Sequence, residues 1–184
     1  MRFLTVLALA LCAPAAFAQP AVVPYGEIAV EFGGDEVVEL LFTNGNSQTL
    51  RAGQGLTAAA GLRVQPVPTV PVSGFAQVGY KFLLNASDNA DIRLTRFPIE
   101  VGVHGHITPD VWAEAAYTRH LSVSLNGDGF FPDEEFDSSN GVTLGAGWRW
   151  IGASYTFINY TAQNGTEIDA SNVGITLRIS SNDF

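Results

Sequence analysis

Residues 96–106 read RFPIEVGVHGH, the clearest alternation of polar and apolar side chains in the chain. The apolar side chains of Phe97, Ile99, Val101 and Val103 fall on one face. The opposite face carries the polar and charged ones, which are Arg96, Glu100, His104 and His106. Successive side chains of a β-strand point to opposite faces, so this period of two predicts a strand with one apolar and one polar side.

The same alternation recurs along the chain. It predicts eight long strands, at residues 27–32, 56–64, 76–82, 96–106, 111–122, 142–150, 153–157 and 173–179. A smaller hairpin is expected in the first long connection, with strands at 37–43 and 49–52 and a turn at Asn44-Gly45. The glycine-rich segments 53–55 and 145–147 lack the strand–loop–helix context of a phosphate site, and we expect them to relieve crowding in a curved sheet. The chain is therefore predicted to be all-β, an eight-stranded antiparallel up-and-down barrel.

The first 18 residues predict a cleaved signal peptide, which leaves residues 19–184 as the barrel domain. Arg2 precedes a short apolar run, and Ala16-Phe17-Ala18 forms a small-x-small cleavage site. The single cysteine, Cys12, lies inside this segment, so disulfides and cysteine-bound metals are excluded from the mature chain. Without Arg2 the chain has 8 basic and 18 acidic residues, a net charge of −10. This balance argues against nucleic acid as a partner.

Three observations favour a barrel with its apolar face outward, in a membrane. The apolar faces carry no acidic residue, and the connections alternate between short (65–73, 108–110, 150–152) and long (34–54, 85–91, 125–140, 161–171). The charges of the polar faces nearly balance, which suits a desolvated interior. We therefore predict an interior polar network of Glu27, Glu31, Arg63, Lys81, Arg96, Glu100, His104, Glu114, His120, Arg149 and Arg178. Side chains fill the interior of an eight-stranded barrel, so an open diffusion pore is not expected.

The signal peptide, the eight alternating strands, the acidic long connections and the terminal Phe184 together resemble the small eight-stranded outer-membrane proteins of Gram-negative bacteria. The resemblance implies an outer-membrane location, contact with outer-membrane lipids and lipopolysaccharide, and insertion by the barrel-assembly machinery. It implies a monomer without a cofactor.

The long connections are strongly acidic. Their carboxylates are Asp35, Glu36, Glu39, Asp88, Asp91, Asp128, Asp133, Glu134, Glu135, Asp137, Glu167 and Asp169. Hard cations favour such groups, which makes a divalent-cation site conceivable, with Asp128, Asp133, Glu134, Glu135 and Asp137 as its candidate ligands. A solvated loop face is the interpretation that we favour.

Two further sets of residues could carry chemistry. His120, Ser122 and Glu134 could form a hydrolytic triad, and the His-x-Ser spacing resembles that of the outer-membrane lipid A deacylases. By parity, however, His120 and Ser122 face the interior, on the fifth strand. A metal site could be built from His104, His106, Glu100, Glu114 and His120, but a polar interior network needs the same residues.

Three classes of function follow from this pattern. A structural or surface-interaction barrel, with a filled polar interior and acidic outer loops, is favoured over an enzyme. A lipid A-modifying hydrolase is the second class. A soluble, lipocalin-like periplasmic barrel is the third, and it predicts an apolar interior.

Overall fold

The computed structural model describes residues 20–41, 47–67, 69–87, 90–130 and 132–180. The predicted signal peptide, the Asn44-Gly45 turn and Phe184 lie outside these residues. Within them the chain forms twelve strands: β1 Ala21–Phe32, β2 Glu36–Leu41, β3 Ser47–Arg51, β4 Gly55–Gln65, β5 Val72–Ser87, β6 Ala90–His106, β7 Val111–Asn126, β8 Glu134–Phe136, β9 Ser139–Trp148, β10 Ile151–Thr161, β11 Glu167–Asp169 and β12 Asn172–Ser180.

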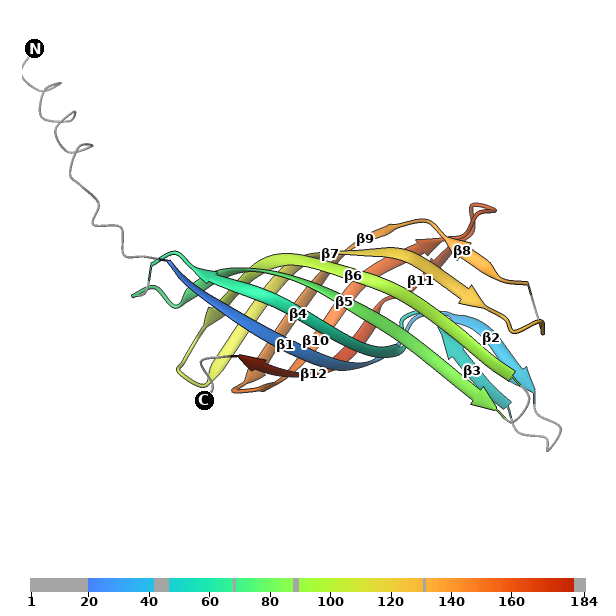
Figure 1. Ribbon diagram of the computed structural model, residues 1–184, viewed down its shortest axis with the longest axis horizontal. Helices are drawn as coiled ribbons and strands as arrows, with labels where there is room; N and C mark the ends of the chain where they lie inside the picture. The colour runs from blue at the N-terminus through green and yellow to red at the C-terminus, as the bar shows by residue number, and fades with distance from the viewer. Residues whose placement is uncertain (1–19, 42–46, 68, 88–89, 131, 181–184) are drawn as a thin grey trace, which may run out of the picture.

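Eight of the described strands close into an antiparallel barrel. They pair in the order β1, β4, β5, β6, β7, β9, β10 and β12, and β12 pairs back with β1. Figure 1 shows these strands wrapping obliquely around a common axis. β2 and β3 form a separate hairpin, as predicted for the first long connection. The predicted all-β, up-and-down barrel is therefore confirmed.

The wall of the barrel is apolar on the outside and polar on the inside. Alternate residues of each strand are exposed and buried, and the exposed positions are the apolar ones, such as Ile28 (54 % exposed), Val78 (59 %) and Ile175 (54 %). The buried positions include Glu27, Lys81, Arg96, His104 and Arg178. The predicted outward orientation of the apolar faces is thus confirmed. In the described part of the chain, no helix has the length and apolarity needed to cross a membrane.

The two ends of the barrel differ. At one end, called here the short-turn end, the strands are joined at residues 66–71, 107–110 and 149–150. At the other, the long-loop end, the connections carry β2, β3, β8 and β11. The loop predicted at 85–91 is wrong, because β5 and β6 continue to pair up to Ser87 and Ala90. Asparagine and aspartate favour turns, but here backbone pairing extends the strands beyond the rest of the wall (Figure 1).

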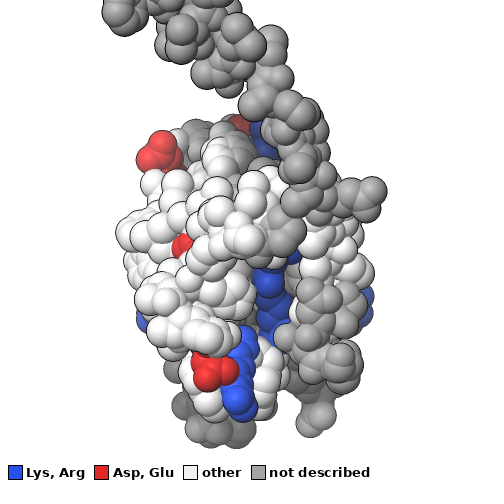
Figure 2. All heavy atoms as spheres, turned by 90° about the vertical axis from the view of Figure 1, so that its left-hand side faces the viewer, with Lys and Arg blue, Asp and Glu red and all other residues white. Residues whose placement is uncertain are grey.

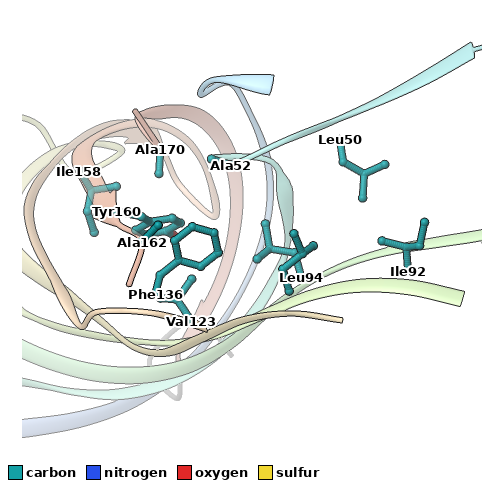
Figure 3. Packing of buried hydrophobic residues seen from close by; sticks show 11 residues of the cluster. Leu50, Ala52, Ile92, Leu94, Val123, Phe136, Ile158, Tyr160, Ala162 and Ala170 are labelled. Atoms are coloured by element: carbon teal, nitrogen blue, oxygen red, sulfur yellow. The ribbon is translucent and has the colours of Figure 1, made fainter. Parts of the chain in front are cut away.

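An apolar cluster fills the long-loop end, above the charged interior. In Figure 3, Phe136, Tyr160 and Val123 lie together, with Leu50 and Ile92 to one side. The cluster joins strands of the wall to the β2–β3 hairpin and to β8. Its buried members are Leu50, Ala52, Ile92, Leu94, Val123, Leu125, Phe136, Ile158, Tyr160, Ala162 and Ala170.

A bulge in β7 turns apolar side chains toward this cluster. Phe97 pairs with Leu121 and Thr95 with Ser124, so β7 has one residue more than β6 over this step. Ser122 takes a positive φ of 49°. A bulge of this kind shifts the alternation by one residue. Val123 therefore points inward and Ser122 is exposed, so the prediction that Ser122 faces the interior is wrong.

A tryptophan fills the interior at the short-turn end. Trp112 is 3 % exposed, and its indole Nε1 donates a hydrogen bond to the carbonyl of Arg149 at 3.0 Å. A Cβ atom added to Gly147 or Gly152 would lie 2.3 Å or 2.5 Å from the Trp112 ring. Glycine at these two positions makes room for the indole, as expected for segment 145–147 in a narrow, curved wall.

Candidate functional site

The centre of the interior holds four ionisable side chains, here called the central ion-pair group: Glu27, His104, Glu114 and Arg178. Arg178 donates from Nε to Glu27 at 2.8 Å and from Nη1 to Glu114 at 2.6 Å, and its Nη2 donates to both carboxylates. His104 Nδ1 lies 3.1 Å from a carboxylate oxygen of Glu114. Each of the four side chains is 8 % exposed or less.

The strand register brings these four residues together. Glu27 of β1 pairs with Arg178 of β12, and His104 of β6 pairs with Glu114 of β7. The guanidinium of Arg178 also lies between two aromatic rings, 5.1 Å from the centroids of both Tyr25 and Trp112. A buried charge is tolerated when its partners replace water, and Arg178 has both carboxylates and ring faces to do so.

The carboxylate of Glu100 also lies near the centre of the interior, and it accepts hydrogen bonds from uncharged donors. Gln77 Nε2 donates to Glu100 at 2.6 Å, and Thr143 Oγ1 donates to Glu100 at 2.9 Å. The hydroxyl of Tyr25 donates to the side-chain oxygen of Gln77 at 2.9 Å. Tyr25, Gln77 and Thr143 were not predicted as members of the interior network, although the alternation places them on the inward face.

A second group, nearer the long-loop end, is rich in cations. Lys81 is 1 % exposed and lies 3.0 Å from Glu31, while Arg96 is fully buried. Lys81 Nζ donates to the carbonyl of Gly53 at 2.8 Å, and Arg96 donates to the carbonyl of Gln54. Interior cations thus hold the backbone at the base of the loop that carries the β2–β3 hairpin.

Two arginines of the predicted network lie at the short-turn end. Arg63 is half-buried, with its guanidinium 5.4 Å from the centroid of the Tyr25 ring. Arg149 lies at the rim of the short-turn end and not in the interior: its side chain is 56 % exposed, its φ is +53°, and it pairs with Asp110 at 3.0 Å. β9 ends at Trp148, one residue before the alternation would have placed Arg149 inside. The prediction that Arg149 belongs to the interior is therefore wrong.

The candidate hydrolytic residues are not assembled. His120 is 3 % exposed and its Nδ1 lies 2.6 Å from the hydroxyl of Tyr160. Ser122 is exposed on the far side of the bulge, and Glu134 belongs to β8, where it pairs with Leu125. A triad needs the serine, the histidine and the carboxylate in sequential hydrogen bonds, which this arrangement does not provide.

The described residues contain no group of three or more His, Cys, Asp or Glu side chains placed to hold a metal ion. Among the loop carboxylates proposed as ligands, Asp133 accepts a hydrogen bond from the backbone of Gly127 at 2.9 Å and one from Asn126 at 3.5 Å. Its carboxylate therefore stabilises its own loop.

Three cavities bear on what the barrel can bind. The first, of about 30 Å³, lies inside the wall among charged and hydroxyl side chains, and has room for one or two waters. The second, of about 250 Å³, opens at the short-turn end, and the third is a groove of about 980 Å³ at the long-loop end. Within the described residues, the interior does not offer the apolar cavity that a lipocalin-like barrel requires.

No protein family and no curated protein sequence matches this chain. Two solved structures of Ail, the attachment invasion locus protein of Yersinia pestis, are similar at 10 % identity and a TM-score of 0.42. The one in complex with the heparin analogue sucrose octasulfate covers 88 % of this chain and 99 % of that chain. The other covers 86 % and 97 %. The closed barrel is established by the strand pairing of this chain itself.

Proposed function

We propose that this protein is an outer-membrane barrel that does not conduct and that presents its long-loop end as a binding surface. The observation that carries the proposal is the inverted polarity of the wall, with ion pairs inside and a continuous apolar surface outside. Soluble proteins rarely expose apolar patches above a few hundred Å². Here every strand of the barrel adds exposed side chains to the patch, including Leu62, Val101, Tyr117, Leu144 and Phe157.

Aromatic side chains support the same orientation. Tyr80 contacts Phe82 and Phe97 on the outer surface, with ring centroids 5.7 Å and 5.2 Å apart. Trp148 and Trp150, 50 % and 54 % exposed, lie at the short-turn end. Aromatic residues at both edges of an apolar band are typical of proteins that span a bilayer.

The interior argues against a conducting role. The central ion-pair group crosses the barrel from β1 and β12 to β6 and β7, and the apolar cluster fills the long-loop end above it. The polar cavity between them has a volume of only about 30 Å³. The filled interior makes the wall an anchor, and the exposed loops are the part that can meet a partner.

The groove of about 980 Å³ at the long-loop end is the surface that we assign to binding. Val37, Val38 and Leu125 supply apolar lining, while Glu39, Asp133, Glu134 and Glu135 supply negative charge. The groove is therefore complementary to a basic polypeptide segment whose lysine or arginine stems can lie on apolar side chains. Contacts with lipopolysaccharide and with the assembly machinery stay predictions from the sequence.

The location is tested by gel mobility of boiled and unboiled protein taken from isolated outer membranes. We expect a heat-dependent mobility shift in that fraction, because a closed membrane barrel resists detergent until it is heated. Protein found in the soluble periplasmic fraction, without a shift, would reject the membrane location.

The groove is tested with an oligolysine peptide and the folded barrel in detergent. We expect the double variant Glu39→Gln/Glu135→Gln to bind the peptide about twofold to thirtyfold more weakly, since each exposed pair contributes about 0.2–1 kcal/mol. Fluorescence anisotropy of a labelled peptide at low salt measures the change. The matched control is Glu36→Gln/Glu167→Gln, which removes the same charge outside the groove. An equal loss in both variants would show that the peptide responds to net charge and not to the groove.

A further inference from the structure

The mouth of the barrel at the short-turn end holds a cavity of about 250 Å³ that is rich in basic side chains, here called the mouth pocket. Four of its lining residues can carry positive charge: Arg63, His106, Arg149 and Arg178. None of the described residues that line it is acidic. Figure 2 looks onto this end and shows basic side chains in a recess near the centre of the face.

His104 presents an unused polar atom to this pocket. The residue is 2 % exposed, and its Nδ1 is engaged by the carboxylate of Glu114 at 3.1 Å. Its Nε2 is buried without a hydrogen-bond partner among the described residues. A carboxylate only accepts hydrogen bonds, so Nδ1 carries a proton and Nε2 is the ring atom left for a ligand. Buried polar atoms are rarely left unsatisfied, and a ligand or an ordered water is the usual partner.

The acidic groups near the pocket lie outside its lining. Glu27 and Glu114 bind Arg178, and Asp110 binds Arg149. These carboxylates fix two of the guanidinium groups without entering the cavity. Arg63, from β4, adds a further positive charge, and His106 packs edge-on against His104 with ring centroids 5.1 Å apart.

We infer that the mouth pocket binds a small soluble anion that carries a phosphate or sulfate group. Guanidinium groups match the oxygens of such anions in geometry and in charge, and Nε2 of a neutral His104 would accept a hydrogen bond from a protonated phosphate oxygen. Ser73 and Ser180 supply hydroxyl groups in the lining. The volume is slightly below the usual range for small-molecule sites, which limits the ligand to a free anion or a small ester.

The test uses the folded full chain in a non-ionic detergent and isothermal titration with inorganic phosphate, with chloride balancing the ionic strength. We expect saturable 1:1 binding. Arg63→Gln and His106→Gln should each weaken it by about tenfold or more, the effect of losing one charge-assisted hydrogen bond. His106 is exposed at the mouth, where its ring packs against that of His104.

Arg119→Gln is the matched control. Arg119 is exposed on the outer face of β7, and the variant makes the same charge change as Arg63→Gln without touching the pocket. Unchanged binding in this control supports the site. Absence of 1:1 binding, or equal weakening in Arg119→Gln, would overturn it. Binding only when vesicles of phosphatidylglycerol are added would assign the contact to a lipid headgroup and would also overturn the inference of a soluble ligand.

Discussion

Replacing Arg178 with methionine is expected to lower the free energy of unfolding by about 3–5 kcal/mol. The guanidinium donates to Glu27 and Glu114, both of them buried. Methionine keeps much of the volume but leaves two carboxylates without a cation in the interior. Urea unfolding of the barrel in lipid vesicles, followed by tryptophan fluorescence, measures the difference.

Arg149→Met is the matched control for this change. Arg149 also pairs with a carboxylate, Asp110, but both side chains are about half exposed. Exposed pairs contribute about 0–1 kcal/mol, so this variant should unfold almost as the parent does. The double variant Arg178→Met/Glu114→Gln should recover part of the loss by removing one unpaired charge. Equal destabilisation by Arg178→Met and Arg149→Met would contradict the central ion-pair group as a determinant of stability.

Replacing Ile175 with arginine is expected to destabilise the barrel in lipid by about 2–4 kcal/mol. Ile175 lies in the middle of β12, is 54 % exposed, and has Val30 and Ala153 as its partners on the neighbouring strands. If this surface faced water, the same substitution would change the free energy of unfolding by no more than about 0.5 kcal/mol. The same vesicle unfolding experiment therefore separates a lipid-facing wall from a soluble one.

Val70→Arg is the matched control, because it also replaces an exposed aliphatic side chain with arginine but at a different height along the barrel. Val70 is 45 % exposed, but it lies in the connection 66–71 at the short-turn end. Near the edge of a bilayer the cost of arginine falls to about 0–1 kcal/mol. Equal effects at Ile175 and Val70 would reject the depth dependence that a membrane imposes.

Much of the wall could be predicted because a barrel is a single layer with two different surroundings. Ile28 and Glu27 are neighbours in sequence, yet one meets the outside and the other meets Arg178 in the interior. The alternation within each strand therefore predicts which of its faces points into the barrel. The same rule could have pointed to Tyr25, Gln77 and Trp112, whose parity places them inside.

The bulge in β7 could not be predicted, because the alternation runs through it without a break. Residues 120–125 read HLSVSL, and a regular strand would place Leu121, Val123 and Leu125 on one face. In the structure Val123 and Leu125 are buried inside at 1 % and 2 % exposure. They turn inward because Phe136 and Tyr160, far along the chain, make the interior apolar at that height.

The alternation in the sequence also could not predict which charged side chains pair with one another. Parity placed Glu27, Glu114 and Arg178 inside, but their contacts depend on the register of strands that are distant in the chain. Arg149 shows the same limit at a strand end, where a turn one residue early moved its side chain to the rim.

The bond between Glu27 and Arg178 joins the first strand of the ring to the last, across 151 residues of chain. We expect a contact so distant in sequence to form late in folding, because closing a long disordered loop costs conformational entropy that pairing of the intervening strands reduces. This contact can arise only once the last strand has docked against the first. It therefore contributes little to the folding rate and mainly opposes the separation of β1 from β12. We therefore expect the rate at which the barrel forms and its lifetime once closed to depend on different residues.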